Sequence, residues 1–238
     1  MQVKVSSSQF NYTYGNRIHF PYSIALLVSY IKTKEKFSQF KFDKTFVFRN
    51  EEKIEEYVEK CRDSDILLCS CYVWNWEITT LVAKKVKEIN PKCLIIFGGP
   101  QVPEILEDFF EKYPFVDIAV HGEGEIIFEN ILSEYLMEKN YFKVKGISTK
   151  DFTTEPQERI KDFDSMPSPY LTNTVFDLVD IVDGYQWIAS WETNRGCPYQ
   201  CTFCDWGSST ATTMRKWSEE RLYKEIEWFG DNKIPYID

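Results

Sequence analysis

Three cysteines stand close together in the segment Cys197-Pro198-Tyr199-Gln200-Cys201-Thr202-Phe203-Cys204. Thiolates bind soft metals, but three ligands cannot complete the four-ligand sites that structural zinc and most iron–sulfur clusters use. Three thiolates can instead hold three irons of a [4Fe–4S] cube and leave the fourth iron open to a ligand that is not protein. The spacing therefore predicts an iron–sulfur cluster bound by Cys197, Cys201 and Cys204.

Two other interpretations of the same cysteines need to be weighed. They could form a three-cysteine zinc site completed by a distant histidine, or they could be reduced and inert thiols. The chain has only two histidines, His19 and His121, and neither has the spacing of a zinc knuckle to the three cysteines. We therefore favour the cluster.

The residues around the cysteines add to this interpretation. Arg195-Gly196 precedes them, Phe203 stands just before the last one, and Asp205-Trp206-Gly207 follows. The run resembles the signature of the radical SAM superfamily. The resemblance implies that the open iron chelates S-adenosylmethionine, that Phe203 lies at the cofactor, and that the reduced cluster cleaves the sulfonium to a 5′-deoxyadenosyl radical. It also implies a small-molecule substrate and an electron donor such as flavodoxin or ferredoxin.

Composition sets outer limits. The chain has 238 residues, which is enough for one or two domains, and 43% of them are hydrophobic, as in a globular protein. The net charge of −9 argues against a large nucleic-acid footprint, which would need a basic face. The apolar runs are too short to cross a membrane, and no secretory signal is recognisable. Seven unevenly spaced cysteines fit a reducing cytoplasm better than a disulfide framework.

Residues 1–150 alternate segments that are typical of strands with segments that are typical of helices. The expected strands are Gln2–Ser6, Lys44–Phe48, Asp65–Tyr72, Cys93–Phe97 and Val116–Val120. The expected helices are Pro21–Lys34, Glu51–Cys61, Ile78–Ile89, Pro103–Lys112 and Glu125–Met137. This alternation predicts a doubly wound α/β domain with about five strands.

Three motifs stand at the expected ends of strands, where ligands bind in open α/β sheets. They are Ser70-Cys71-Tyr72-Val73-Trp74-Asn75, Gly98-Gly99-Pro100-Gln101 and Gly122-Glu123-Gly124-Glu125. In this order they resemble the cobalamin-binding domain that precedes many radical SAM domains. The resemblance implies that Ser70, Tyr72, Gly98 and Gly99 bind cobalamin, since glycine lets the backbone approach a ligand closely. The glycine pair is equally consistent with a tight turn, and the acidic motif with a helix start.

The sequence departs from many cobalamin domains in one respect. Their Asp-x-His-x-x-Gly motif, whose histidine ligates cobalt, is absent, because His19 has no aspartate two residues before it and no glycine three residues after it. We therefore expect cobalamin to bind without a histidine below the cobalt. Cobalamin-dependent radical SAM methylases commonly lack this ligand.

Residues 151–185 lose periodicity and are interpreted as a linker, and residues 186–238 begin a new β/α unit. Here Gln186–Glu192 is expected to be a strand, Ser218–Asp231 a helix capped by Ser218, and Ile234–Asp238 the start of a second strand. The resemblance implies an α/β architecture in which a doubly wound Rossmann-like cobalamin-binding-type domain is followed by the first part of a radical SAM partial (β/α)6 barrel. We also expect Leu222, Ile226 and Phe229 to form an exposed apolar stripe.

The resemblance implies an enzyme, a cobalamin-dependent radical SAM methyltransferase that acts on an unactivated carbon, with a [4Fe–4S] cluster, S-adenosylmethionine and cobalamin as cofactors. One alternative is a tRNA methylthiotransferase, although its three further cluster cysteines do not match the spacing of Cys61, Cys69, Cys71 and Cys93. Another is a non-catalytic fragment that only binds a cofactor. The four other cysteines are most simply small buried apolar residues. No residue is singled out as catalytic.

Overall fold

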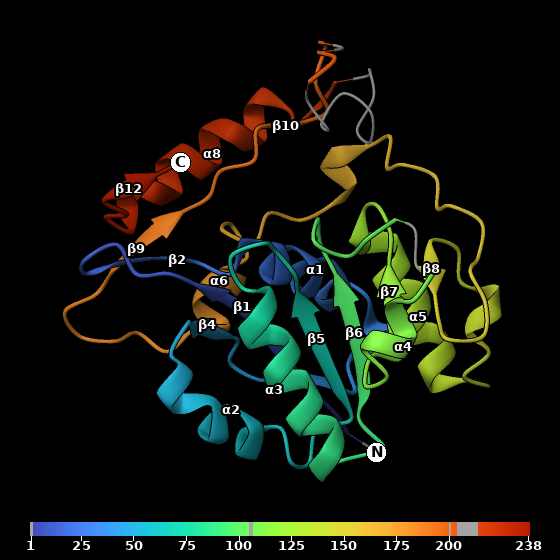
Figure 1. The fold of residues 1–238 in the computed structure, drawn as a ribbon. Helices are drawn as coiled ribbons and strands as arrows, with labels where there is room; N and C mark the ends of the chain where they lie inside the picture. Colours follow the sequence, from blue (N-terminus) through green and yellow to red (C-terminus); the bar gives the residue numbers. More distant parts are fainter. Residues whose placement is uncertain (1, 105–106, 200, 204–213) are drawn as a thin grey trace.

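The first part of the chain is built around a seven-stranded sheet (Figure 1). The structure is a computed structural model that describes residues 2–104, 107–199, 201–203 and 214–238. The strands of this sheet are β1 (Val3–Asn11), β3 (Phe40–Phe42), β4 (Phe46–Phe48), β5 (Ile66–Ser70), β6 (Leu94–Gly98), β7 (Ile118–Val120) and β8 (Ile147–Ser148). Their order is β3-β1-β5-β6-β7-β8, with β4 also paired to β1, and all pairs are parallel except β7–β8.

Helices cover both faces of this sheet. They are α1 (Tyr22–Lys32), α2 (Ile54–Lys60), α3 (Trp76–Ile89), α4 (Phe109–Lys112) and α5 (Gly124–Leu136). One apolar core contains buried residues of α1 and α5, and a second contains those of α2, α3 and α4. The predicted doubly wound α/β arrangement is therefore confirmed.

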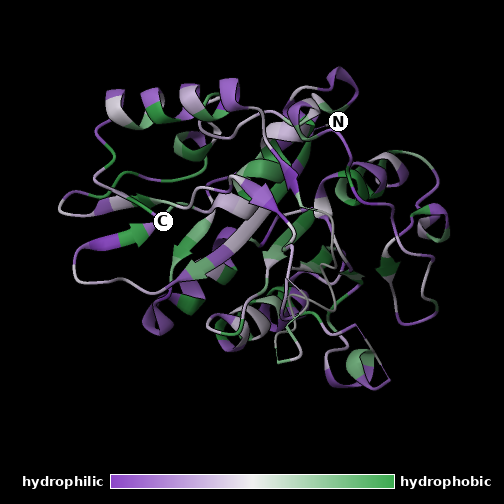
Figure 2. Ribbon diagram, turned by 90° about the horizontal axis from the view of Figure 1, so that it is seen from above, coloured by the Kyte–Doolittle hydropathy of each residue, from purple (hydrophilic) through white to green (hydrophobic). Residues whose placement is uncertain are grey.

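Hydropathy explains why the elements take these places. The strand β5 is buried along its whole length, as a central parallel strand covered by helices on both faces must be. In Figure 2 some strands are green along their length and others carry white and purple parts, while the surrounding helices carry both purple and green turns. Such amphipathic helices bury one face against the sheet and expose the other.

A second, three-stranded sheet lies across the carboxyl ends of the first (Figure 1). It contains β9 (Gln186–Ala189), flanked on both sides by parallel strands, β12 (Tyr236–Ile237) and β2 (Arg17–His19). The strand β2 comes from near the start of the chain, so the chain joins both sheets within its first 20 residues. This was not predicted, because three residues between turns carry no periodic pattern.

The segment between the two sheets packs against the first one. It contains the short helix α6 (Thr174–Asp177), and its Tyr170, Val175 and Leu178 belong to the same apolar core as α1 and α5. The segment is therefore well packed, although its sequence has no regular period.

The helix α8 (Glu219–Asp231) lies between β9 and β12 in the sequence, and the Ser218 side chain accepts a hydrogen bond from the Arg221 N–H, as predicted for its N-cap. The predicted exposed stripe is wrong for Phe229, which is only 2% exposed because it packs against Tyr170 and Trp191. Ile226 is exposed as expected.

The other predicted elements differ mainly at their ends. The first strand extends to Asn11, well beyond the predicted Ser6. The sheet has seven strands and not the predicted five, since it also contains β3 and β8, which are too short to be predicted from the sequence. The predicted helix Pro103–Lys112 is helical only over Phe109–Lys112 among the described residues. No helix in the described ranges is long and apolar enough to span a membrane.

Candidate functional site

A cavity of about 400 Å³ lies where the carboxyl ends of the first sheet meet the second sheet. Residues at the end of β1, after β5 and after β9 contribute to it, so both sheets form its walls. The residues that line it are Gln9, Asn11, Tyr12, Tyr14, His19, Tyr22, Ser23, Tyr72, Trp74, Ser190 and Asp238. Ligands of open α/β sheets bind at this edge, which makes the cavity the first candidate for a cofactor site.

The loop after β5 holds Tyr72 rigidly at the cavity. The Tyr72 ring stacks on Trp74 with centroids 4.4 Å apart, and its hydroxyl lies 2.7 Å from the Ser23 hydroxyl. The fully buried Asn75 fixes the loop backbone, since its Oδ1 accepts from the Tyr72 N–H and its Nδ2 donates to the carbonyl of Ser70. The predicted cofactor residue Tyr72 therefore faces a preformed cavity.

Asn11 supplies an unused hydrogen-bond donor at the same place. Its Oδ1 accepts a bond of 3.3 Å from the Trp74 indole, but its Nδ2 is buried and has no partner in the described part of the chain. Leaving a buried donor unpaired costs free energy, so such a group often marks a ligand contact. This orphaned amide fits a polar group of a bound cofactor such as cobalamin.

The other predicted cobalamin residues, Ser70, Gly98 and Gly99, are not among the residues that line the cavity. Ser70 and Gly98 are paired across β5 and β6, and Ser70 is buried. Gly99 has a φ of +106°, and a Cβ there would stand 2.6 Å from the carbonyl oxygen of Cys71. This contact with its own chain is sufficient reason for glycine at position 99, so a role of Ser70, Gly98 and Gly99 in cofactor binding stays a prediction.

Each of the two histidines has a hydrogen-bond partner. His19 Nε2 lies 2.7 Å from Asp238 Oδ2 at the cavity, and His121 Nε2 lies 2.9 Å from the Ser148 hydroxyl, between β7 and β8. Burial lowers the pKa of His121, which favours its neutral form.

The cysteine segment lies beyond the same edge of the sheet (Figure 1). Cys197 is partly exposed, Cys201 is exposed and the Phe203 side chain is 90% exposed, whereas Cys204 and Asp205-Trp206-Gly207 lie outside the described residues. Within the described ranges, which exclude Cys204, no three metal-ligating side chains come together. Accessible thiols fit a cysteine set that takes up a cluster, because thiolates must be able to reach the metal.

Polar side chains connect the cavity to the cysteine segment. Tyr22, which lines the cavity, donates a hydrogen bond of 3.3 Å to Glu192, and Glu192 accepts one of 2.8 Å from Arg195 Nε. Burial would lower the pKa of Arg195, but Glu125 and Glu192 outweigh burial and raise it, so the guanidinium stays charged. Burial raises the pKa of Tyr22, so its hydroxyl remains a donor.

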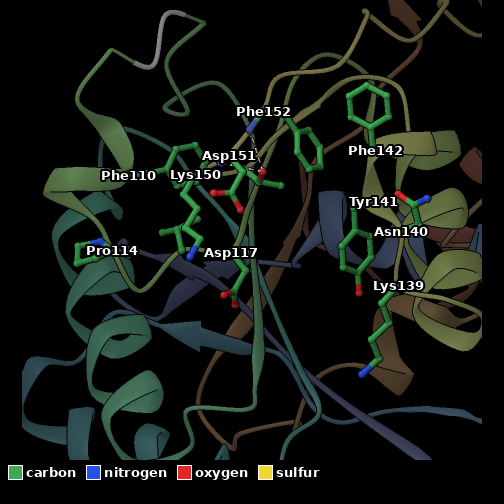
Figure 3. A pocket seen from close by; sticks show the side chains of 12 residues that line it. Phe110, Pro114, Asp117, Lys139, Asn140, Tyr141, Phe142, Lys150, Asp151 and Phe152 are labelled. Atoms are coloured by element: carbon green, nitrogen blue, oxygen red, sulfur yellow. Dashed lines mark hydrogen bonds between the residues drawn. The ribbon is translucent and has the colours of Figure 1, made fainter.

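A second cavity, of about 370 Å³, lies near the amino-terminal end of β7 (Figure 3). Tyr141 and Lys139 extend into it from one side, and Phe110 and Lys150 from the other, with Asp117 between them. Asp117 is already paired with Lys87 at 2.7 Å. This cavity lies at the amino-terminal edge of the sheet, away from the cysteine segment.

Comparison with known proteins identifies the first part of the chain. The family model described as the B12 binding domain matches residues 25–132. The cobalamin-dependent radical SAM methyltransferase TokK of Streptomyces tokunonensis is 42% identical over 188 residues, which cover 76% of this chain and 28% of TokK. Residues 25–132 therefore match a B12 binding domain, and the chain resembles the radical SAM proteins that carry such a domain.

Two further comparisons agree with this assignment. A 2-(S-pantetheinyl)-carbapenam-3-carboxylate methyltransferase of Streptantibioticus cattleyicolor is also 42% identical, over 76% of this chain and 28% of that protein. The solved structure of the cobalamin-dependent S-adenosylmethionine radical enzyme OxsB superposes with a TM-score of 0.69 at 20% identity, covering 99% of this chain and 33% of that one. The predicted fold, a cobalamin-binding-type domain followed by the first part of a radical SAM domain, is thus confirmed. The chain spans less than a third of the length of TokK and of the carbapenam methyltransferase.

The sequence pointed to Tyr72 but missed most of the cavity. Asn11 and Tyr22 lie 50 or more positions before Tyr72, and Ser190 lies far after it. The one local signal was polarity: β1 ends in Gln9 and Asn11 although it is buried throughout that stretch. A buried strand that ends in amide side chains needs partners for them, which is a hint of a site.

Proposed function

We propose that this chain is part of an enzyme, a cobalamin-dependent radical SAM methyltransferase that acts on an unactivated carbon of a small molecule. The observation that carries the proposal is the shared edge: the cavity at the strand ends and the cysteine segment lie on the same side of the sheet and are joined through Tyr22, Glu192 and Arg195. A substrate carbon that is activated at the cluster and methylated from cobalamin would require the two cofactors to lie close together.

Each group of residues would have a distinct role. Cys197, Cys201 and Cys204 would bind the [4Fe–4S] cluster, and the cavity around Asn11 and Tyr72 would hold part of the cobalamin. When bound, these groups supply a 5′-deoxyadenosyl radical from S-adenosylmethionine and a methyl group from cobalamin. With the cofactors bound, the aromatic residues that line the cavity would help to exclude water, which protects reactive species from quenching.

The remaining features of the proposal follow from the cofactors. A low-potential cluster needs an electron donor such as flavodoxin or ferredoxin, and an oxygen-sensitive one needs a reducing compartment, so we place the enzyme in the cytoplasm. With a net charge of −9, no nucleic-acid partner is proposed.

The burial of the other cysteines argues against the methylthiotransferase alternative. Cys61, Cys69, Cys71 and Cys93 are at most 1% exposed and belong to one apolar core. Burial raises the pKa of Cys61 and of Cys93 to about 12, so both stay protonated thiols. Such thiols do not present the thiolates that a second cluster would need.

Anaerobic reconstitution tests the proposal. The protein with iron, sulfide and a strong reductant should hold about four irons and four sulfides per chain and show the EPR signal of a reduced cube. A Cys197→Ala, Cys201→Ala, Cys204→Ala variant should lose both, while the control Cys93→Ala should keep them. Equal iron in the triple variant would contradict the cluster assignment.

Product analysis of the whole enzyme separates catalysis from mere cofactor binding. Formation of 5′-deoxyadenosine from S-adenosylmethionine is expected with the wild-type cysteines and not with the triple variant. A reconstituted whole enzyme that holds the cluster but forms no 5′-deoxyadenosine would favour the non-catalytic alternative.

A further inference from the structure

A very short antiparallel ladder flanks the cysteine segment in the sequence. β10 (Asn194–Arg195) pairs with β11 (Arg215–Lys216), with Asn194 opposite Lys216 and Arg195 opposite Arg215. Residues 196–214, which include all three cysteines, lie between these strands. We call this ladder the loop neck. Two strands of two residues each are not stable alone, so the neck needs support from outside.

The two arginines, Arg195 and Arg215, increase this need for outside support. Like charges placed directly opposite each other on a sheet destabilise the pairing. In addition, both guanidinium groups lie over the ring of Phe163, at 5.2 Å for Arg195 and 5.0 Å for Arg215. The neck therefore holds two cations around a single aromatic ring. Glu192 supplies one carboxylate to Arg195, and the pair of arginines needs further negative charge.

The start of α5, in the cobalamin-binding domain, supplies this charge. Glu123 contacts both arginines: its Oε1 lies 2.5 Å from an Arg215 nitrogen and 4.0 Å from one of Arg195. Glu125 Oε1 accepts a hydrogen bond of 2.6 Å from Arg195. Glu123 also accepts from the Ile160 N–H at 2.8 Å, which fixes its own position.

The burial of these groups shows that solvent cannot replace the contacts. The side chain of Glu125 is 3% exposed, and those of Glu123, Arg195 and Arg215 are 15–16% exposed. The second carboxylate oxygen of Glu125 is buried without a partner among the described residues. A buried carboxylate with one unpaired oxygen is expensive for stability, so stability alone does not explain its presence.

We propose that Glu123 and Glu125 are positioning residues for the cysteine segment, acting through Arg215 and Arg195. The cobalamin-binding domain would thereby set the place and the electrostatic surroundings of the cluster. The part of this inference that concerns the cluster rests on the proposed function, whereas the part that concerns the loop neck does not.

Hydrogen exchange in the metal-free protein tests the neck. The variants are Glu123→Gln, Glu125→Gln and their double variant. The matched control is Glu129→Gln on the same helix, α5, whose side chain is 16% exposed like that of Glu123 and pairs with Lys34 and Lys36 instead of the neck. We expect the amides of residues 194–195 and 215–216 to exchange roughly tenfold faster in the double variant than in the wild type. The control should leave these amides unchanged. If the double variant does not fold, Glu123→Gln alone decides, since Glu123 contacts both arginines.

The reduction potential of the reconstituted cluster tests the positioning role. Glu→Gln removes negative charge near the cysteines, so the midpoint potential should shift to a more positive value while the iron content stays the same. The control Glu129→Gln should keep the wild-type potential. Wild-type exchange rates at the neck in both the double and the Glu123→Gln variants, or a wild-type potential and EPR spectrum in them, would overturn the proposal. A wild-type protein that binds no cluster would instead contradict the proposed function, and the exchange experiment would still decide the neck.

Discussion

The hydroxyl of Tyr170 donates a hydrogen bond of 2.5 Å to the carbonyl oxygen of Ser190. Tyr170 comes from the segment between the two sheets, and Ser190 follows β9 and lines the cavity. The tyrosine is fully buried, and its ring packs on Trp228 and Phe229 of α8. One side chain thus joins the linking segment, the second sheet and the helix that follows it.

Tyr170→Phe should therefore destabilise the protein modestly. The variant keeps the ring packing but removes the donor and leaves the Ser190 carbonyl without this partner, which costs about 0.5–1.5 kcal/mol. Tyr170→Ala should cost about 3–5 kcal/mol because the ring contacts are lost as well. Urea denaturation measures both. Tyr223→Phe on the exposed face of α8 is the control, and a loss in it as large as in Tyr170→Phe would refute this account.

Bound cobalamin should have no nitrogen ligand below the cobalt. One ring nitrogen of His19 is paired with Asp238, and His121 is held at Ser148. The EPR spectrum of the Co(II) form should show no splitting from a nitrogen ligand, and His19→Ala should retain cobalamin. Nitrogen splitting that disappears in His19→Ala would show that this histidine does ligate cobalt.

Asn11→Leu should weaken cofactor binding while leaving the stability of the ligand-free protein about the same. Replacing the amide removes the penalty of the buried, unpaired Nδ2, and this gain offsets the loss of the 3.3 Å bond from the Trp74 indole. If the same amide contacts cobalamin, the variant should retain less of it after gel filtration. Thermal unfolding and the cobalamin absorbance measure the two effects, and unchanged cobalamin retention would exclude the contact.

How far the sequence predicts this structure depends on how far apart in the chain the interacting residues lie. The helix over α3 and the strand β5 were predicted closely because apolar periodicity and a continuous apolar run are local patterns. The strand β2 was not, because its three residues join the second sheet only through a partner, β9, that lies about 170 positions later. Pairing at that distance is decided by tertiary packing.

The same distinction holds at the candidate site. The spacing of Cys197, Cys201 and Cys204 is local and predicts its chemistry directly. Glu123 and Glu125 were interpreted as acids at a helix start, which is where they lie. Their second role became visible only when folding brought Arg195 and Arg215 to them from a distance of about 70 to 90 residues.

The contribution of Glu123 to stability should depend on pH. Burial alone would raise its pKa, but hydrogen bonds from Arg215 and Ile160 and the charge of Arg195 outweigh burial and lower it below 4.5. A lowered carboxyl pKa gives stability that is complete above the unfolded value of 4.5 and is lost as the pH falls through the folded value. Urea denaturation should show Glu123→Gln less stable than wild type at neutral pH, with the difference shrinking below about pH 4.5. A difference that stays constant with pH would contradict this.

The buried ion pair of Arg221 and Glu225 should be costly to break but replaceable as a unit. Arg221 Nε lies 3.0 Å from Glu225 Oε1, the guanidinium stands 3.5 Å from the centre of the Trp217 ring, and the side chains are 9% and 3% exposed. Removing one partner leaves the other charge buried, so Arg221→Ala and Glu225→Ala should each cost about 3–5 kcal/mol.

The double replacement Arg221→Met, Glu225→Leu separates the charge from the packing. Apolar side chains of similar size avoid the desolvation of two charges, so the double variant should be much less destabilised than either single variant, and closer to the wild type. The double variant should still be somewhat less stable than the wild type, because it loses two further hydrogen bonds. Arg221 donates to the Met166 carbonyl at 2.6 Å, and Glu225 accepts from Trp191 at 2.7 Å. Urea denaturation of all four proteins measures the coupling. If the double variant loses as much as the two single variants together, these two contacts, and not the paired charges, hold α8 in place.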